Sequence, residues 1–337
     1  MKVNRWFFLA GATALLALVV LGCGGGSDPQ TTAKPIRPLS PTRELDITID
    51  GYPGPENVGI LMAYYGGYFE KLGLSVWIRT PQSRMRPLPY VAEEEVALAV
   101  SHQPQVVLAG DKEAPVAAFG SLVSQPTAAL MWPKKSKIGG IAGLKGKTIA
   151  ITGLPFEKSF LESVLARGGL TIDDVKLVYA DYELVPTLLS GQADAIFGSW
   201  NVEGVELEKK GLQPVIKRVQ GLGIPSYEEL VLIARPERLA KEQQVIRTFM
   251  AALARGTAAA IEDPEAAARL LAKERGESLT PALKAEVQAT VPLLSKTGEM
   301  DPEKASGLVA WMHEQGMIEK EPSASELFSN DYLPPSP

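Results

Sequence analysis

The chain has 337 residues, of which 45% are hydrophobic and 22% charged, and its formal net charge is −5. This balance is typical of a folded globular protein with room for about two domains, and it excludes a disordered or collagen-like chain. The acidic charge argues against a nucleic-acid-binding protein, which usually presents a basic face. One cysteine and two histidines exclude an internal disulfide and a zinc site made of four Cys and His ligands.

The first 22 residues have the pattern of a secretory signal peptide. Lys2 and Arg5 form a short positive region before an apolar run at 6–21, which is short of the roughly 20 apolar residues that a membrane span needs. The run ends in VLGCG, where the cysteine is Cys23. This ending resembles the bacterial lipobox, which implies a lipidated Cys23 as the first residue of the mature protein. An ordinary cleaved signal with a chance cysteine and a short membrane anchor are the alternatives.

Residues 23–43 are predicted to form a flexible tether. They are rich in Gly, Pro, Ser and Thr and have no apolar periodicity. Together with a lipidated Cys23, the tether would hold a folded body outside the cytoplasm and anchored to the bacterial cell membrane.

Strand-like and helix-like segments alternate after the tether. In chain order, we expect strands at 44–50, 74–79, 96–100, 116–120, 128–132, 147–152, 175–179, 193–197, 213–216 and 229–234, with helices at 57–65, 104–109, 156–167, 184–190 and 202–210. Four more helices follow without strands, at 236–260, 264–274, 281–295 and 302–315. The alternation predicts an α/β fold in which helices flank mostly parallel sheets.

The order of the elements predicts two lobes joined by two hinge crossings. A polar, basic stretch at 134–140 precedes a fresh series of strands and helices, which ends near residue 224. We therefore assign 44–133 and 225–337 to a discontinuous lobe I and 134–224 to lobe II. The crevice between such lobes is a typical small-molecule site. Two sequential domains are the alternative.

Several segments carry a family resemblance. They are 50–59 (DGYPGPENVG), 67–69 (GYF) with 73–74 (GL), 101–104 (SHQP), 144–147 (LKGK), 189–195 (LSGQADA), 200–203 (WNVE) and 330–334 (NDYLP). In this order they resemble the type II periplasmic substrate-binding proteins of ABC importers, and within them the branch for thiamin pyrimidine precursors, which has relatives for sulfonates, nitrate and riboflavin. The resemblance implies a monomer that delivers a small ligand to a permease and its ATPase.

The chain departs from the pyrimidine branch at two positions. Gly51 stands where that branch usually has Trp, and Asn57 stands where it usually has His. A stacking ring and a polar ring are therefore missing, which leaves more space for a ligand at this wall of the pocket. A pyrimidine precursor such as hydroxymethylpyrimidine or formylaminopyrimidine is the ligand that the resemblance implies, and riboflavin or another flavin is the alternative.

Candidate ligand-binding residues follow the expected strands, because loops at the carboxyl ends of strands line the crevice in this architecture. They are Tyr52, Asn57, Ser101, Gln103, Phe156, Tyr182, Trp200, Glu203 and Tyr227. Trp200 is expected to stack on a flat ring, while Asn57, Gln103 and Glu203 would hydrogen-bond its edges. The N–H groups at 153–156 would favour a carbonyl or an anion. Each of these residues has an alternative role. Asn57 could cap a helix and Gln103 could hydrogen-bond within its own loop. Phe156 could pack in the core, and Glu203 could be an exposed helix side chain.

Catalysis has little support in the sequence. It contains neither a Gly-x-Ser-x-Gly elbow nor a phosphate-binding loop. His102 is interpreted as a hydrogen-bonded neutral residue rather than a metal ligand, and no metal or cofactor is expected. A binding protein that is not an enzyme is the favoured interpretation. A sulfonate or nitrate binder, a pyrimidine-synthesis enzyme on the same fold, and a sensor or adhesion lipoprotein remain alternatives.

Overall fold

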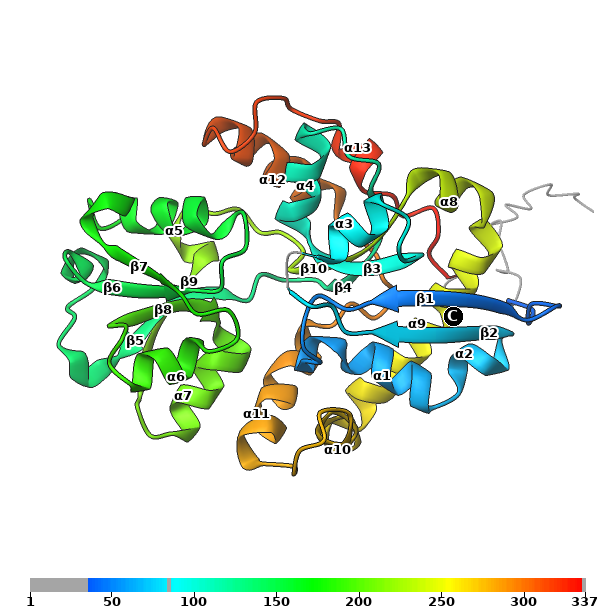
Figure 1. Ribbon diagram of the computed structural model, residues 1–337, viewed down its shortest axis with the longest axis horizontal. Coiled ribbons are helices and arrows are strands. Elements are labelled where there is room, and N and C mark those ends of the chain that lie inside the picture. Colours follow the sequence, from blue (N-terminus) through cyan, green and yellow to red (C-terminus); the bar gives the residue numbers. More distant parts are fainter. Residues whose placement is uncertain (1–35, 84–85, 335–337) are drawn as a thin grey trace, which may run out of the picture. The chain divides into compact units, whose positions relative to one another are not determined.

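The computed structural model describes residues 36–83 and 86–334 (Figure 1). Within this part of the chain, strands form two five-stranded sheets, which we call the first sheet (order β2-β1-β3-β10-β4) and the second sheet (order β7-β6-β8-β5-β9). The strands are β1 (Arg43–Thr48), β2 (Leu74–Arg79), β3 (Leu98–His102), β4 (Ala117–Val123), β5 (Ala128–Pro133), β6 (Thr148–Ile151), β7 (Lys176–Tyr179), β8 (Ala195–Ser199), β9 (Pro214–Arg218) and β10 (Leu230–Ala234).

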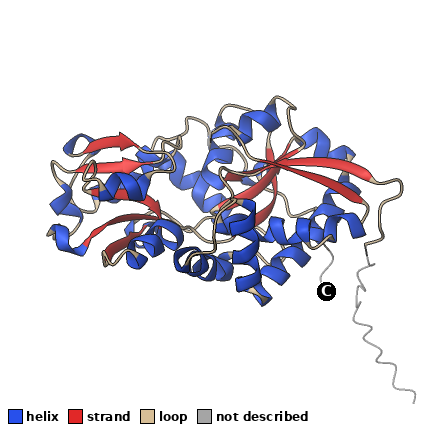
Figure 2. Cartoon of the chain, turned by 60° about the horizontal axis from the view of Figure 1, so that its bottom comes forward, coloured by secondary structure: helices blue, strands red, loops and turns tan. Residues whose placement is uncertain are grey.

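Helices cover both faces of the sheets (Figure 2). They are α1 (Val58–Tyr65), α2 (Tyr68–Lys71), α3 (Pro87–Ala92), α4 (Gln103–Asp111), α5 (Glu157–Ala166), α6 (Leu184–Leu189), α7 (Val205–Lys209), α8 (Pro236–Lys241), α9 (Gln243–Glu262), α10 (Pro264–Glu274), α11 (Pro281–Thr290), α12 (Pro302–Glu314) and α13 (Ala324–Leu327). None of the described helices combines the length and the apolar character that a membrane crossing requires.

Three late helices begin where the sequence places a capping residue before proline. Asp263, Thr280 and Asp301 each accept a backbone N–H of the first turn of α10, α11 and α12, and a proline follows each of them. Proline suits this first position because its missing N–H would have no partner there. The expected helix at 236–260 is in fact two helices, since Glu242 has non-helical dihedral angles and separates α8 from α9.

Each sheet contains one strand that opposes the other four. β10 pairs antiparallel with β3 and β4, and β5 pairs antiparallel with β8 and β9, while the β1–β2, β1–β3, β6–β7 and β6–β8 pairs are parallel. Both opposing strands are the first strand after the chain passes from one sheet to the other. A strand that comes from the other sheet starts at the edge where its parallel neighbours end, so it must run against them. The sheets are therefore mixed.

The position of β5 corrects the expected lobe boundary. Residues 128–133 were assigned to lobe I, yet β5 pairs with β8 and β9 of the second sheet (Figure 1). The chain thus passes between the sheets at 124–127, and the polar stretch at 134–140 lies within the part of the chain that builds the second sheet. The apolar pattern of 128–132 marks a buried strand but carries no information about which sheet it joins. The return passage lies at 219–229, between β9 and β10.

The end of the expected tether belongs to the folded body. The Leu39 N–H donates to the Leu72 carbonyl over 2.9 Å, and the Leu39 side chain packs against the apolar core of the first sheet. Arg43 is the first residue of β1. The expected signal peptide at 1–22, Cys23 and the tether as far as residue 35 lie outside the described residues.

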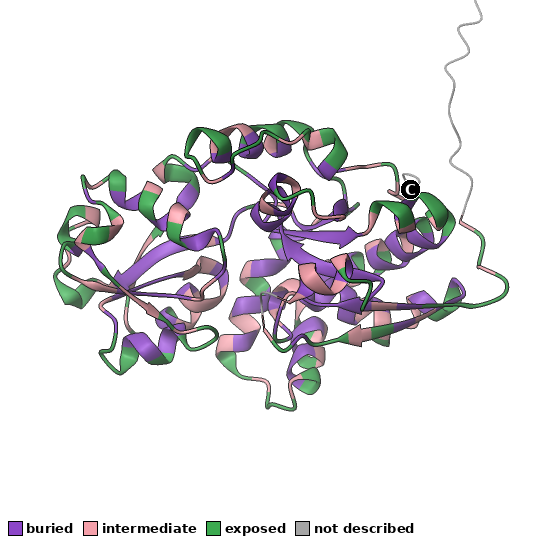
Figure 3. Cartoon of the chain, turned by 45° about the horizontal axis from the view of Figure 1, so that its top comes forward, coloured by how far each residue is buried: buried purple, intermediate pink, exposed green. Residues whose placement is uncertain are grey.

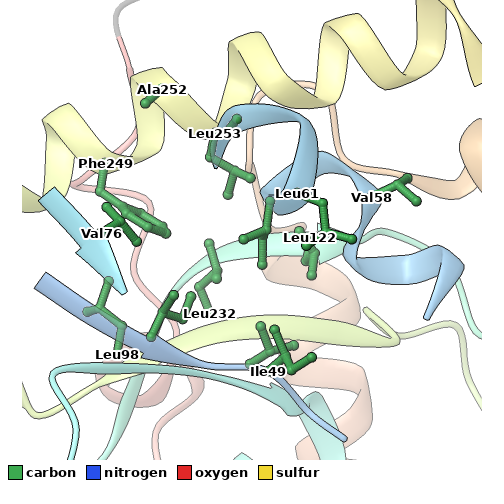
Figure 4. Close-up of a cluster of buried hydrophobic side chains, with 14 of the residues drawn as sticks. Ile49, Val58, Leu61, Val76, Leu98, Leu122, Leu232, Phe249, Ala252 and Leu253 are labelled. Carbon is green, nitrogen blue, oxygen red and sulfur yellow. The ribbon is translucent and has the colours of Figure 1, made fainter. Parts of the chain in front are cut away.

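The main core lies between the first sheet and α1, α2 and α9. Leu253 of α9 faces Leu61 of α1 above the strands, and Phe249 of α9 lies beside Val76 of β2 (Figure 4). Gly256 permits the close crossing of α1 and α9, because a Cβ there would collide with backbone of α1. Buried residues follow the strands of both sheets (Figure 3). This packing leaves the carboxyl ends of the parallel strands free to carry polar loops.

Candidate functional site

A cavity of about 730 Å³ lies at the carboxyl ends of the parallel strands of both sheets. From the first sheet it is lined by the loop after β1 and by His102 at the end of β3, and from the second sheet by the loops after β6, β7 and β8. The α10–α11 segment closes a further side with residues between Arg275 and Glu286. The volume is within the range of small-molecule sites, roughly 300–1,000 Å³.

Five of the nine expected binding residues line this cavity: Tyr52, Asn57, Phe156, Tyr182 and Glu203. Tyr52 and Tyr182 come from the two different sheets and meet across it, since the Tyr52 N–H donates to the Tyr182 hydroxyl over 3.2 Å. The Tyr52 hydroxyl donates to the Arg275 carbonyl, and the Arg275 guanidinium lies 5.4 Å from the centre of the Tyr52 ring. Both tyrosines keep more than a third of their surface exposed.

The Asn57 amide supports the loop that carries it. Its Nδ2 donates to Asp50 Oδ1 over 3.0 Å and its Oδ1 accepts the Gly54 N–H over 2.9 Å. Asn57 is almost fully buried. These bonds fix the path of the chain from β1 into α1. Asn57 stands at the N-cap position of α1, but its side chain accepts no N–H of that helix and supports the preceding loop instead.

The loop after β6 holds an internal carboxylate where the sequence suggested a site for an anion. The N–H groups of Gly153 and Leu154 donate to Glu157 Oε2 over 2.6 and 3.0 Å, and the Thr152 hydroxyl donates to Glu157 Oε1 over 2.7 Å. Burial raises the pKa of Glu157, and these hydrogen bonds oppose the rise. The expectation that these N–H groups face a ligand carbonyl or anion is therefore wrong, because the Glu157 carboxylate accepts the hydrogen bonds of Gly153 and Leu154.

Phe156 and Glu203 reach the cavity from the second sheet. The Phe156 ring lies at the start of α5, 5.5 Å from the His102 ring and 5.0 Å from Phe160. Glu203 belongs to a short π-helix, Trp200–Gly204, and its Oε2 accepts the Ser199 N–H over 2.7 Å. Phe156 thus combines core packing with a place in the cavity wall.

Four expected binding residues do not line the cavity: Ser101, Gln103, Trp200 and Tyr227. The Ser101 hydroxyl donates to Gln105 Oε1 over 3.0 Å, and the Gln103 Oε1 accepts the Glu228 N–H over 2.8 Å. Successive side chains of a strand point to opposite faces, so Ser101 turns away from the side on which His102 meets the cavity. The position of these residues near the end of a strand indicated the correct edge of the sheet, but it did not indicate which face their side chains lie on.

Trp200 and Tyr227 are packing residues. The Arg218 guanidinium lies 3.6 Å from the centre of the Trp200 ring, which packs against buried apolar side chains of both sheets. Tyr227 is fully buried, and its hydroxyl donates to Glu229 Oε2 over 3.3 Å. The expectations of a stacking plate at Trp200 and of a gate at Tyr227 are therefore corrected.

Sequence reasoning missed most of the charge in the cavity. Its described lining contains eight carboxylates and three Lys or Arg side chains: Asp50, Glu56, Glu157, Glu203, Glu206, Glu229, Glu277 and Glu286 against Lys209, Lys210 and Arg275. Burial raises the pKa of Glu286 to about 7. Loss of hydration also raises the pKa of Glu56 to about 7, with Asp50 adding to the rise. Glutamates of this kind are common on helices, so no local pattern could have identified them.

This arrangement favours a ligand that donates hydrogen bonds or carries positive charge. Carboxylates only accept hydrogen bonds while they are ionised, and an anion would meet a lining with more carboxyl groups than Lys and Arg side chains in a partly dehydrated space. Among the described residues, no group of His, Cys, Asp and Glu side chains has the arrangement of a metal site.

Comparison with known proteins places the chain in a family. Residues 54–267 match the family model described as NMT1/THI5 like. The chain is 31% identical to a putative thiamine biosynthesis protein of Haemophilus influenzae over 82% of this chain and 88% of that protein. It is 28% identical to the formylaminopyrimidine-binding protein of Halalkalibacterium halodurans, over 85% and 89% of the two chains. A 4-amino-5-hydroxymethyl-2-methylpyrimidine phosphate synthase of Legionella pneumophila is 24% identical, over 87% and 93%.

The fold matches solved binding proteins. The alkanesulfonate-binding protein SsuA of Xanthomonas axonopodis pv. citri, solved with bound MOPS, aligns with a TM-score of 0.68 at 16% identity and covers 86% of this chain and 99% of its own. The two mixed sheets with flanking helices are those of a type II periplasmic binding protein. On the extent of the sequence match and the relatives found, the chain belongs to the NMT1/THI5-like family.

Proposed function

We propose that the chain is the solute-binding component of an ABC importer and that it captures an aminopyrimidine precursor of thiamin in its cavity. The relative from Halalkalibacterium halodurans is named for formylaminopyrimidine binding, and the fold is that of importer binding proteins. The ligand would pass to a membrane permease with its ATPase subunits. A monomer is sufficient for this role, because both sheets that wall the cavity come from one chain.

The acidic lining of the cavity is the observation that carries the choice of ligand. An aminopyrimidine offers amino hydrogens to carboxylates and a flat ring to Tyr52, Phe156 and Tyr182. Alkanesulfonate and nitrate are anions, and Glu157 takes the loop N–H groups that would otherwise bind them. The sulfonate and nitrate alternatives are therefore disfavoured, although a structural neighbour binds a sulfonate.

A flavin is a second candidate, favoured by the size of the cavity. About 730 Å³ is large for a single pyrimidine ring, and Gly51 adds no side chain to the wall after β1. A neutral flavin ring has one imide N–H to donate, so the acidic lining suits it less well than it suits an aminopyrimidine.

Binding without chemical conversion is part of the proposal. The synthase of Legionella pneumophila is less similar than the two relatives described before it. Incubation of the protein with hydroxymethylpyrimidine, followed by mass spectrometry of the recovered ligand, is expected to return the compound unchanged. Recovery of a phosphorylated or rearranged product would favour the enzyme alternative.

Titration calorimetry tests the ligand class. We expect formylaminopyrimidine and hydroxymethylpyrimidine to bind with micromolar or tighter dissociation constants, and taurine and nitrate not to bind under the same conditions. Binding of riboflavin with no response to either pyrimidine would replace the proposal with the flavin alternative. Binding of taurine alone would overturn the argument from cavity charge.

We also propose that Cys23 carries the lipid that anchors the protein outside the cytoplasm. Mass spectrometry of the mature protein from bacterial membranes is expected to give an N-terminal peptide that begins with acylated Cys23. A Cys23→Ser variant would then be recovered in the soluble extracytoplasmic fraction. Equal membrane retention of both forms would contradict the lipid anchor.

A further inference from the structure

His102 and Glu229 form a buried pair at the wall of the cavity. His102 ends β3, Glu229 immediately precedes β10, and both line the cavity. The His102 Nδ1 lies 3.0 Å from Glu229 Oε1, and both side chains are at most 10% exposed. The Phe156 ring packs on the imidazole from the second sheet, and Glu157 follows it on the same helix.

The partners of Glu229 determine which imidazole nitrogen carries the proton. Its Oε2 accepts the Thr127 N–H over 2.6 Å and the Tyr227 hydroxyl over 3.3 Å. Burial raises the pKa of Tyr227 well above its usual range, so this hydroxyl stays a donor. Burial alone would raise the pKa of Glu229, but the hydrogen bond and the electrostatic attraction from His102, together with the hydrogen bonds from Thr127, outweigh it and lower the pKa. An ionised carboxylate can only accept, so Nδ1 must donate.

The remaining ring nitrogen is then an acceptor without a partner among the described residues. When the imidazole is neutral, its single proton lies on Nδ1 and Nε2 presents a lone pair. Nε2 is buried and makes no hydrogen bond to any described residue. A buried acceptor left unpaired costs free energy, which a ligand donor would recover on binding.

We infer that His102 is a specificity-determining residue whose Nε2 accepts an N–H or O–H of the ligand. The inference rests on the proposed function, and for an aminopyrimidine the donor is the exocyclic amino group or the hydroxymethyl group. Glu229 acts as a positioning residue that holds the imidazole in this tautomer. A ligand with a carbonyl in place of the amino group is rejected, because two acceptors would face each other.

Glu229→Gln is expected to reverse this preference. The amide oxygen must take the Oε2 position, because Thr127 and Tyr227 both donate there. The amide NH₂ then faces Nδ1 and donates to it, which moves the imidazole proton to Nε2. The variant should bind the 4-oxo analogue of hydroxymethylpyrimidine better than the 4-amino form.

Nitrogen NMR of the ligand-free protein tests the tautomer directly. The chain has only two histidines, so a ¹⁵N-histidine-labelled sample is assigned by comparison with His313→Asn. We expect His102 to show a protonated Nδ1 and an unprotonated Nε2 at pH 8, and the opposite pattern in Glu229→Gln. A protonated Nε2 in the unmodified protein would overturn the inference whatever the ligand is.

Calorimetry tests the contact with the ligand. In His102→Asn the amide nitrogen can still donate to Glu229, while the atom at Nε2 is removed. We expect about tenfold weaker binding of hydroxymethylpyrimidine, the effect of about one lost hydrogen bond, and unchanged binding in His313→Asn. Unchanged affinity in His102→Asn overturns the inference and leaves the proposed function standing. Absence of aminopyrimidine binding by the unmodified protein overturns the proposed function, and with it the donor named here.

Discussion

The backbone N–H of Thr127 donates to the Glu229 carboxylate over 2.6 Å and thereby joins the two passages of the chain between the sheets. Thr127 lies on the outgoing passage and Glu229 at the end of the return passage. A second bond joins the passages, since Gln220 Nε2 donates to the Pro126 carbonyl over 3.2 Å. The two passages are therefore joined by hydrogen bonds beside the cavity wall.

Removal of this carboxylate should destabilise the protein. Glu229→Ala leaves the Thr127 N–H, the Tyr227 hydroxyl and His102 Nδ1 without their shared acceptor. We expect a loss of about 2–4 kcal/mol in the free energy of unfolding at pH 7, measured by urea denaturation. Because the pKa of Glu229 is lowered on folding, its contribution is present above the unfolded pKa and is lost as the pH falls through the folded value. A similar loss in the exposed Glu237→Ala would contradict this explanation.

The raised pKa of Glu286 predicts a stability that declines toward alkaline pH. Burial raises this pKa to about 7, so the folded state opposes ionisation of the carboxyl group. The contribution of Glu286 is complete below its unfolded pKa, falls as the pH rises, and levels off above the folded value. Glu286→Gln should thus be more stable than the unmodified chain at pH 8, by up to about 3 kcal/mol, and equal to it near pH 4. Denaturation measured across this pH range tests the prediction, with Glu277→Gln as the control. The same pH dependence of stability in both variants would contradict it.

Tyr182→Phe is expected to weaken ligand binding. The substitution removes the hydroxyl that accepts the Tyr52 N–H across the cavity and keeps the aromatic ring. An exposed hydrogen bond contributes about 0.5–1.5 kcal/mol, so ligand affinity should fall about two- to tenfold. Calorimetry with hydroxymethylpyrimidine measures the change, and Tyr179→Phe, outside the cavity lining, is the matched control. Equal losses of ligand affinity in both variants would show that the Tyr52–Tyr182 hydrogen bond does not contribute to ligand binding.

Trp200→Ala is expected to affect stability more than ligand binding. The ring is partly buried between apolar side chains and the Arg218 guanidinium. Its removal should lower the free energy of unfolding by about 2–3 kcal/mol, somewhat below the range for fully buried aromatic residues. Affinity measured well below the denaturation midpoint should change by less than threefold, that is, by under about 0.7 kcal/mol. A large loss of affinity in a stable variant would restore the stacking role expected from the sequence.

Local patterns in the sequence were sufficient to predict most of the helices and strands. The strand at 74–79 and the helix at 264–274 have the expected bounds, because periods of two and 3.6 residues report which side chains are buried. The prolines that begin α10, α11 and α12 act within a single turn, so their effect is readable without the fold. Resemblance over many short segments indicated the family, which the comparisons confirm.

Only the tertiary structure decided which side chains meet at the cavity. Periodicity shows that β5 is buried but not which sheet it completes, since pairing partners lie far away in the chain. Position near the end of a strand identifies the edge of the sheet but not the face, and the face separates His102 from Ser101. Gln103 already belongs to α4. The acidity of the cavity arises because loops from both sheets and the α10–α11 segment converge on one space, where loss of hydration raises the pKa of Glu286. Burial and convergence are properties of the packed chain, so they depend on contacts that no local pattern contains.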